Sequence, residues 1–184
     1  PQNTRNACSD MPRYYGVMGL IADGKNWFRD NLQQVANLSG YKPDDLYRQP
    51  EKQIMAYAAA FSALQQQLGC TSTQIEHNLP VLYALSELPE SPNPQADFAL
   101  NSQIYQILYW LNHPQFRATY GLNNANAPQI NIAAILGPTV YAQVTAASQQ
   151  ITIPANLPTP TTPNSGPAKN PEACTMPDGP AQYS

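Results

Sequence analysis

The chain has 184 residues and a formal net charge of −3, and charged side chains make up only 11% of it. That share is well below the roughly 25% of an average soluble domain, and uncharged polar residues and Pro take the place of the missing charges, as in many extracellular proteins. Nucleic-acid binding depends on clustered positive charge, and no run of Lys or Arg occurs, so nucleic acid is not expected as a partner. No stretch approaches about 20 continuous apolar residues, so no membrane-spanning segment is expected.

The start of the chain and its cysteines bear on where the protein works. The sequence begins at Pro1 with neither an initiator Met nor a signal peptide, so we expect a processed piece of a longer secreted precursor. Cys8, Cys70 and Cys174 are widely spaced and lack the close pairs of a zinc site. Two interpretations stay open: one disulfide with one thiol left over, or three unpaired buried thiols in a reducing compartment.

Hydrophobic spacing predicts three helices in the first part of the chain. Residues 27–38 carry apolar side chains at helical spacing before Gly40, and residues 43–46 open a short helical turn with Pro and two acids. The stripe between Pro50 and Leu68 is the longest, so this helix is predicted to be the central buried element. The stripe comprises Ile54, Ala58, Phe61, Leu64 and Leu68, thickened by Met55 and Ala59.

The same reasoning predicts helices over residues 75–88, 96–112 and 139–148. In the second of these, the residues expected to face inward are Leu100, Ile104, Ile107, Leu108 and Leu111, widened by Phe98, Tyr105, Tyr109 and Trp110. Residues 130–136 fit either a β-rich run or a short buried helix.

The last part of the chain has a different composition. From Pro154 onward Pro recurs among Thr, Asn, Gly and Ala, which favours extended polyproline-like chain over a packed core. The expected fold is therefore mainly α: a helical domain over residues 1–150, followed by a proline-rich irregular tail or linker over residues 151–184.

Three segments carry a family resemblance: residues 15–20 (YGVMGL), 31–40 (NLQQVANLSG) and 44–50 (DDLYRQP). They resemble the goose-type-lysozyme and lytic-transglycosylase-like domain at the front of some secreted bacterial N-acetylmuramoyl-L-alanine amidases. The resemblance continues through residues 80–87 (PVLYALSE) and 101–108 (NSQIYQIL). It implies a lysozyme-like helical domain in which YGVMGL forms a Gly-x-Met-x-Leu turn beside a sugar cleft.

The sequence departs from that family at the catalytic acid. Lysozyme-like enzymes place a general-acid Glu shortly before this turn, whereas residues 1–14 contain only Asp10 as a carboxylate. Glycoside cleavage needs a protonated carboxylic acid aimed at the glycosidic oxygen. Either the acid lay in a lost precursor segment, or the domain holds glycan without cutting it. Glu87, in a loop that the family directs at the sugar, is the best catalytic candidate here, and the alternative is an exposed acid beside a turn.

Aromatic side chains are the candidate sugar contacts, because pyranose rings stack on aromatic faces. Tyr14 and Tyr15, next to the glycine turn, are the first candidates, and Met18 and Tyr83 complete the predicted substrate-binding set, although a Tyr at helical spacing is also a common core residue. No metal site and no cofactor are predicted, because His77 and His113 are too few for most catalytic zinc sites.

The leading hypothesis is the N-terminal domain of a secreted bacterial peptidoglycan hydrolase, which binds glycan or guards a downstream amidase domain and lacks its own general acid. Residues 177–181 (PDGPA) resemble the approach to such an amidase domain. One alternative is an active muramidase-type glycosidase, and another is a non-enzymatic extracellular structural or assembly protein. The expected partners are peptidoglycan or another glycan and a downstream domain of the same precursor, and the expected location is extracellular or in the cell wall.

Overall fold

The computed structural model describes residues 12–22, 28–70, 72, 74–123 and 128–148. Within these residues the protein is mainly helical, as the sequence predicts, with eight α-helices and one two-stranded antiparallel hairpin. No helix in these ranges is both long and apolar enough to cross a membrane.

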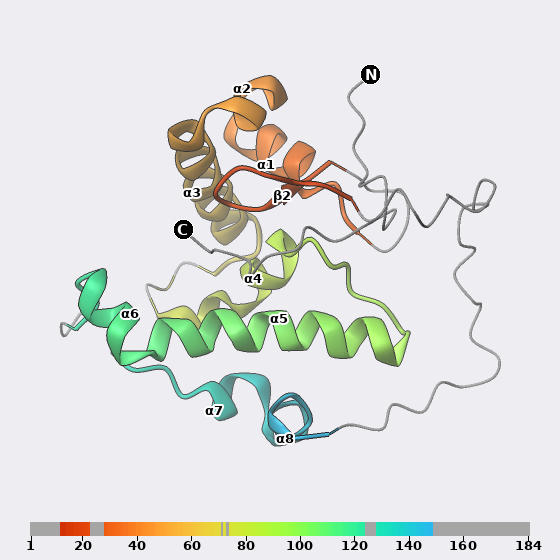
Figure 1. Ribbon diagram of the computed structural model, residues 1–184, viewed down its shortest axis with the longest axis vertical. Helices are drawn as coiled ribbons and strands as arrows, with labels where there is room; N and C mark the ends of the chain where they lie inside the picture. Colours follow the sequence, from red (N-terminus) through yellow and green to blue (C-terminus); the bar gives the residue numbers. More distant parts are fainter. Residues whose placement is uncertain (1–11, 23–27, 71, 73, 124–127, 149–184) are drawn as a thin grey trace, which may run out of the picture.

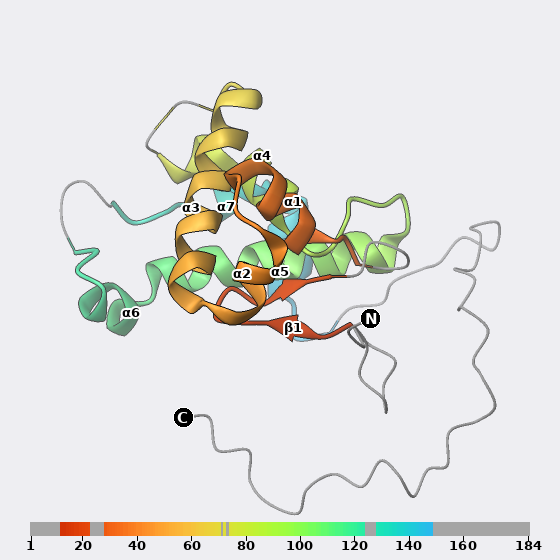
Figure 2. The same cartoon turned by 90° about the horizontal axis from the view of Figure 1, so that it is seen from above.

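The elements form two groups with one helix between them (Figure 1). The upper group contains β1 (Tyr14–Tyr15), β2 (Leu20–Ile21), α1 (Asn31–Ser39), α2 (Pro43–Arg48) and α3 (Pro50–Gln67). The lower group contains α5 (Pro94–Asn112), α6 (Pro114–Thr119), α7 (Ile132–Leu136) and α8 (Pro138–Thr145). A 3-10 turn, η1 (Ile75–Asn78), leads into α4 (Leu79–Leu85), which lies between the groups. Figure 2 shows the upper helices from above, over α5.

The helix ends follow from local side-chain chemistry. The Asp30 carboxylate caps α1 by accepting a hydrogen bond from the Gln33 amide at 3.0 Å. At the other end Gly40 adopts φ 75°, and its N–H donates to the Ala36 carbonyl. The helix predicted from residue 27 therefore begins at Asn31, and residue 27 itself lies outside the described ranges.

The hydrophobic core has two parts that meet at α4. The upper core joins β2, α1, α2 and α3 to Val81 and Leu85 of α4. The lower core is built on α5 and α7, and Leu82 of the same α4 helix packs against it. The fully buried upper residues include Leu20, Leu32, Val35, Leu46, Ala56, Ala60, Val81 and Leu85, and the buried lower residues are Leu100, Ile104, Leu108 and Leu136.

The predicted face of α3 is only partly correct. Leu64 is buried and Phe61 packs against the upper core, as predicted. Ile54 is 52% exposed, Met55 59% and Leu68 47%, and Ala58 and Ala59 are exposed as well. The rest of the buried face consists of Gln53, Ala56 and Ala60. The small alanines let α3 approach its neighbours closely, and the buried Gln53 has hydrogen-bond partners. A prediction that assigns the largest apolar side chains to the buried face therefore misses these residues. α3 therefore packs one narrow face against α1, α2 and α4 and exposes the rest, so it is not buried on all sides.

Other predicted elements differ in their bounds. The helix expected over residues 75–88 breaks at Asn78, whose side-chain amide donates to the carbonyls of Ser72 and Gln74, and α4 ends at Leu85. Residues 130–136 resolve into the short helix α7, and α8 ends at Thr145 instead of residue 148. On α5 the buried stripe is confirmed at Leu100, Ile104 and Leu108. The remaining predicted inward residues of α5 include Ile107, Tyr109 and Trp110, which are exposed.

Two predictions concern residues that the structure does not describe. The proline-rich tail predicted over residues 151–184 lies outside the described ranges, as do Cys8 and Cys174. Cys70, which is described, has a free thiol. The tail and a disulfide between the other two cysteines therefore stay predictions.

Candidate functional site

The turn of the β1–β2 hairpin is held by one buried side chain, Gln53 of α3. Its Oε1 accepts a hydrogen bond from the Met18 amide at 2.6 Å, and its Nε2 donates to the carbonyls of Tyr15 and Leu46, both at 2.9 Å. Gly16 has φ 62°, and a Cβ there would overlap the Gln53 amide. The glycine turn and Gln53 are therefore one structural unit, which joins the hairpin to α2 and α3.

Sequence reasoning did not single out Gln53 as a functional or structural residue. The only signal was a polar residue in the first turn of a helix, and such residues are usually solvated. Its role depends on a turn that lies 35 residues earlier in the chain.

Two of the predicted sugar-contact residues, Tyr15 and Met18, pack against the upper core. The Tyr15 ring packs edge-on against Tyr47, with ring centroids 4.5 Å apart, and both rings lie against the upper core. Met18 is partly buried against the same core. Tyr14 differs, because its side of the hairpin leaves it 58% exposed.

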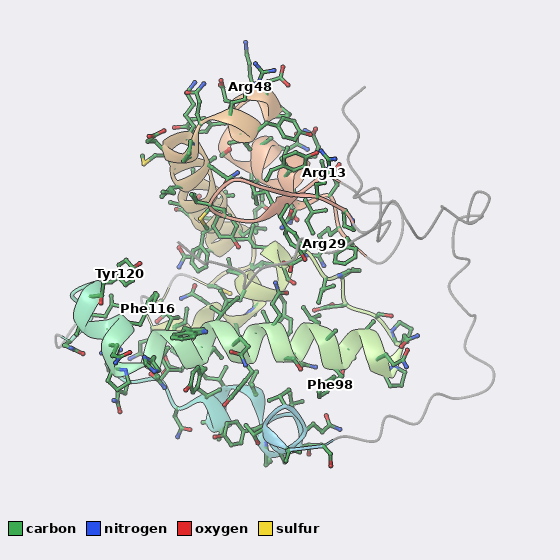
Figure 3. All side chains as sticks on the ribbon, viewed as in Figure 1. Arg13, Arg29, Arg48, Phe98, Phe116 and Tyr120 are labelled. Carbon is green, nitrogen blue, oxygen red and sulfur yellow. The ribbon has the colours of Figure 1, made fainter. Side chains whose placement is uncertain are left out.

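The C-terminal end of α4 is fixed by side chains from α1 and the residues before it. The Arg29 guanidinium donates to the carbonyls of Tyr83 and Ala84, and Gln34 Nε2 donates to the Ala84 carbonyl at 2.9 Å. A cation at a helix C-terminus complements the helix dipole. Asn31 accepts from the Ile21 amide of β2 at 2.6 Å, so α1 links α4 to the hairpin. Arg29 lies between the hairpin and α4 (Figure 3).

Glu87 follows directly on this fixed helix end. The Arg29 amide donates to the Glu87 carbonyl at 2.7 Å, and the Glu87 carboxylate accepts a hydrogen bond from the Gln103 side chain of α5. Gln103 in turn accepts from the Ser86 hydroxyl. The carboxylate is thus partly buried and held in one place by elements from both halves of the fold.

The electrostatic effect of Glu87 shows which tyrosines lie near it. Burial raises the pKa of Tyr57 to about 12, with the Glu87 charge as a second cause. Burial and then the same charge also raise the pKa of Tyr14. The Glu87 charge thus acts on Tyr14, a second predicted site residue, and on Tyr57, while Gln103 holds the Glu87 carboxylate. We call these four residues the Tyr14–Glu87 surface.

Tyr83 belongs to a different place. Its hydroxyl donates to Asn101 Oδ1 at 2.6 Å, and its ring lines a pocket of about 400 Å³ beside the first turns of α5. Burial raises the pKa of Tyr83, with further contributions from Asp97 and Glu90. The Tyr83 hydroxyl is thus engaged by α5, and its role in sugar binding stays a prediction.

The chemistry open to the Tyr14–Glu87 surface is non-covalent recognition of hydroxyl-rich molecules. An exposed ring offers a stacking face, and a fixed carboxylate accepts hydrogen bonds from hydroxyl groups. No group of three or more His, Cys, Asp or Glu side chains arranged to hold a metal ion is found among the described residues. When the chain is compared with known proteins, no family model, no curated protein and no solved structure matches it.

Proposed function

We propose that this chain is the glycan-binding, non-catalytic domain of a secreted bacterial cell-wall hydrolase, and that the Tyr14–Glu87 surface contacts the sugar. The observation that carries the proposal is an exposed Tyr14 ring within electrostatic range of the Glu87 carboxylate, which accepts a hydrogen bond from Gln103. Preorganised polar groups next to an aromatic face are what a carbohydrate site requires. The sequence resemblance to lysozyme-like domains supports peptidoglycan as the ligand.

The hydrogen bonding of Glu87 favours binding over catalysis. A general acid in glycoside cleavage must carry a proton that it can give to the leaving oxygen. The Gln103 amide donates its N–H to the Glu87 carboxylate, so one carboxylate oxygen is already engaged by the protein. A carboxylate held in this way serves as an acceptor for sugar hydroxyls.

Retention on insoluble peptidoglycan tests the proposal. The chain is expected to sediment with purified cell walls, and Tyr14→Ala is expected to weaken retention about fivefold to tenfold, because a stacking contact contributes about 1 kcal/mol. Tyr120→Ala is the matched control, since Tyr120 is 65% exposed and lies on the far side of the molecule, after α6 (Figure 3). Equal retention of the two variants would rule out the Tyr14–Glu87 surface as the sugar contact.

The active glycosidase is the second candidate, because Glu87 is a partly buried carboxylate whose charge acts on Tyr14 and Tyr57. Dye release from labelled peptidoglycan separates it from the binding domain. Turnover that Glu87→Gln abolishes would establish the glycosidase, since loss of general-acid assistance reduces the rate by about 10²–10⁴. Neither retention nor turnover would favour the third hypothesis, a structural or assembly protein.

A further inference from the structure

The pocket beside Tyr83 has a lining unlike that of the Tyr14–Glu87 surface. It encloses about 400 Å³ where the loop after α4 meets the first turns of α5, at the end of α5 marked by Phe98 in Figure 3. Pro92 and Tyr83 give it an apolar side, and the buried Leu100 lies beneath them. Its polar lining consists of Glu90, Ser91, Asp97 and Asn101.

The Tyr83 hydroxyl and the Asn101 amide donate hydrogen bonds within the pocket lining, while the Ser91 hydroxyl accepts one from the Asn93 amide at 3.1 Å. The Tyr83 hydroxyl donates its single proton to Asn101 Oδ1 at 2.6 Å, so the phenol oxygen can only accept a further bond. Asn101 is 7% exposed, and its Nδ2 donates to Asp97 Oδ2 at 3.1 Å. This chain of bonds orients the lining and leaves acceptors facing the pocket.

The helix N-terminus next to the pocket does not supply donors. Asn93 Oδ1 accepts from the amides of Gln95 and Ala96 at 2.9 and 3.3 Å, and Pro94 has no N–H. The Asp97 amide donates to the Asn93 carbonyl at 2.9 Å. The groups that make a helix N-terminus an anion site are therefore occupied, and an anionic ligand does not fit.

The pocket also carries uncompensated negative charge. Glu90 and Asp97 are both exposed side chains. Between described residues, the salt bridge that forms joins Lys52 to Asp45, so no described cation neutralises either pocket carboxylate. Both charges act on Tyr83, as the raised pKa of its phenol indicates.

We propose that this pocket binds a primary ammonium group on an aliphatic chain, such as the lysine side chain of a peptide. An ammonium group has three donors and no acceptor, which complements a lining of acceptors with two carboxylates. The methylene groups of such a chain fit against Pro92 and Tyr83. The site is separate from the proposed glycan surface and does not depend on that assignment.

Titration of the full chain with Nα-acetyl-L-lysine methylamide, followed by amide chemical shifts, tests this site. Shifts are expected at residues 90–101, and the norleucine analogue, which has an apolar side chain without the ammonium group, is expected to bind at least about fivefold more weakly. Glu90→Gln and Asp97→Asn should each weaken lysine binding about twofold to fivefold, in line with a partly exposed charge pair. Glu51→Gln, an exposed acid on α3, is the control and should leave it unchanged.

Several outcomes would overturn the proposal. They are an absence of shifts with the lysine probe, equal affinity for the norleucine probe, or a lysine affinity that neither Glu90→Gln nor Asp97→Asn lowers. Glu90 lies in a loop before α5, so Glu90→Gln stays informative even if Asp97→Asn weakens the helix start. Tyr14→Ala should keep full lysine binding, which separates failure of this pocket from failure of the glycan surface.

Discussion

At the scale of single residues, Gln53 is the side chain on which the hairpin turn most depends. Removing its amide leaves the Met18 N–H and the carbonyls of Tyr15 and Leu46 without their partner. Gln53→Ala is expected to lower the free energy of unfolding by about 2–4 kcal/mol, because unpaired buried polar groups cost about 1–3 kcal/mol each. Urea denaturation measures the change, with the exposed Gln66→Ala on the same helix as control, expected within about 0.5 kcal/mol. Similar effects for the two variants would contradict the role of Gln53.

Tyr57 is expected to make the free energy of unfolding depend on pH in the alkaline range. Its pKa is about 12 in the folded protein, raised first by burial and then by Glu87, against about 10 in an unfolded chain. The folded value is the higher one, so the stability contribution is fully present below pH 10 and is lost as pH rises from about 10 to about 12. Over that window the native protein should lose up to about 2–3 kcal/mol that Tyr57→Phe does not lose.

Thermal unfolding of the native protein and of Tyr57→Phe between pH 9 and about 11.5 measures this loss of stability. A short extrapolation of both curves gives the difference at about pH 12. The Tyr120→Phe variant is the comparison, because Tyr120 is 65% exposed. Parallel pH profiles for the native protein and Tyr57→Phe would show that the Tyr57 phenol does not carry the effect.

At the scale of secondary structure elements, α5 was predictable and the face of α3 was not. Leu100, Ile104 and Leu108 are large, apolar and correctly spaced, so α5 has one face that is buried in any reasonable packing. On α3 the large apolar residues Ile54, Met55 and Leu68 face solvent, and the buried face combines Leu64 with two alanines and a glutamine. The reason is a tertiary contact, because Gln53 is paired with a hairpin turn that is far away in the sequence. The hydrophobic periodicity of one helix carries no information about such a partner.

The candidate site also contains residues that the sequence identified and one that it did not. Tyr14 and Glu87 were identified from the sequence, since both adjoin turns that the resemblance directs at a sugar. Gln103 was not, because it supports Glu87 only when α5 lies against the loop after α4. Tyr15 and Met18 adjoin the same turn as Tyr14, but the strand and turn geometry places both against the core.

The packing of α3 gives a test at this scale. Ala60 is fully buried against the upper core, and Ala59, its neighbour in sequence, is exposed. Ala60→Leu should destabilise the protein by about 1–3 kcal/mol, because extra methylene groups do not fit a close-packed interface. Ala59→Leu has nearly the same helix propensity cost and should stay within about 0.5 kcal/mol. Chemical denaturation of the two variants measures their free energies of unfolding. If the predicted face were the buried one, Ala59→Leu would be the more destabilising of the two.

At the scale of the whole molecule, α4 determines whether the two cores act as one. It places Leu85 in the upper core and Leu82 against the lower core, and its last carbonyls are held by Arg29 and Gln34. The hydrogen bond between Glu87 and Gln103 adds a second connection between the groups. A fold joined in this way is expected to unfold in one cooperative transition.

Hydrogen exchange on two matched variants tests that cooperativity. Leu85→Ala in the upper core and Leu108→Ala in the lower core each remove a fully buried leucine and should cost about 2–5 kcal/mol. If the cores unfold together, each variant lowers the protection of the slowest amides in α1 and in α5 by the same amount, because these amides exchange only through global unfolding. If Leu108→Ala lowers protection in α5 and leaves α1 unchanged, the cores open separately. In that case α4 would be a hinge between the hairpin, which carries Tyr14, and α5, which carries Gln103. A glycan that contacts both Tyr14 and Glu87 would then raise the protection of amides in α5 as well as in the hairpin.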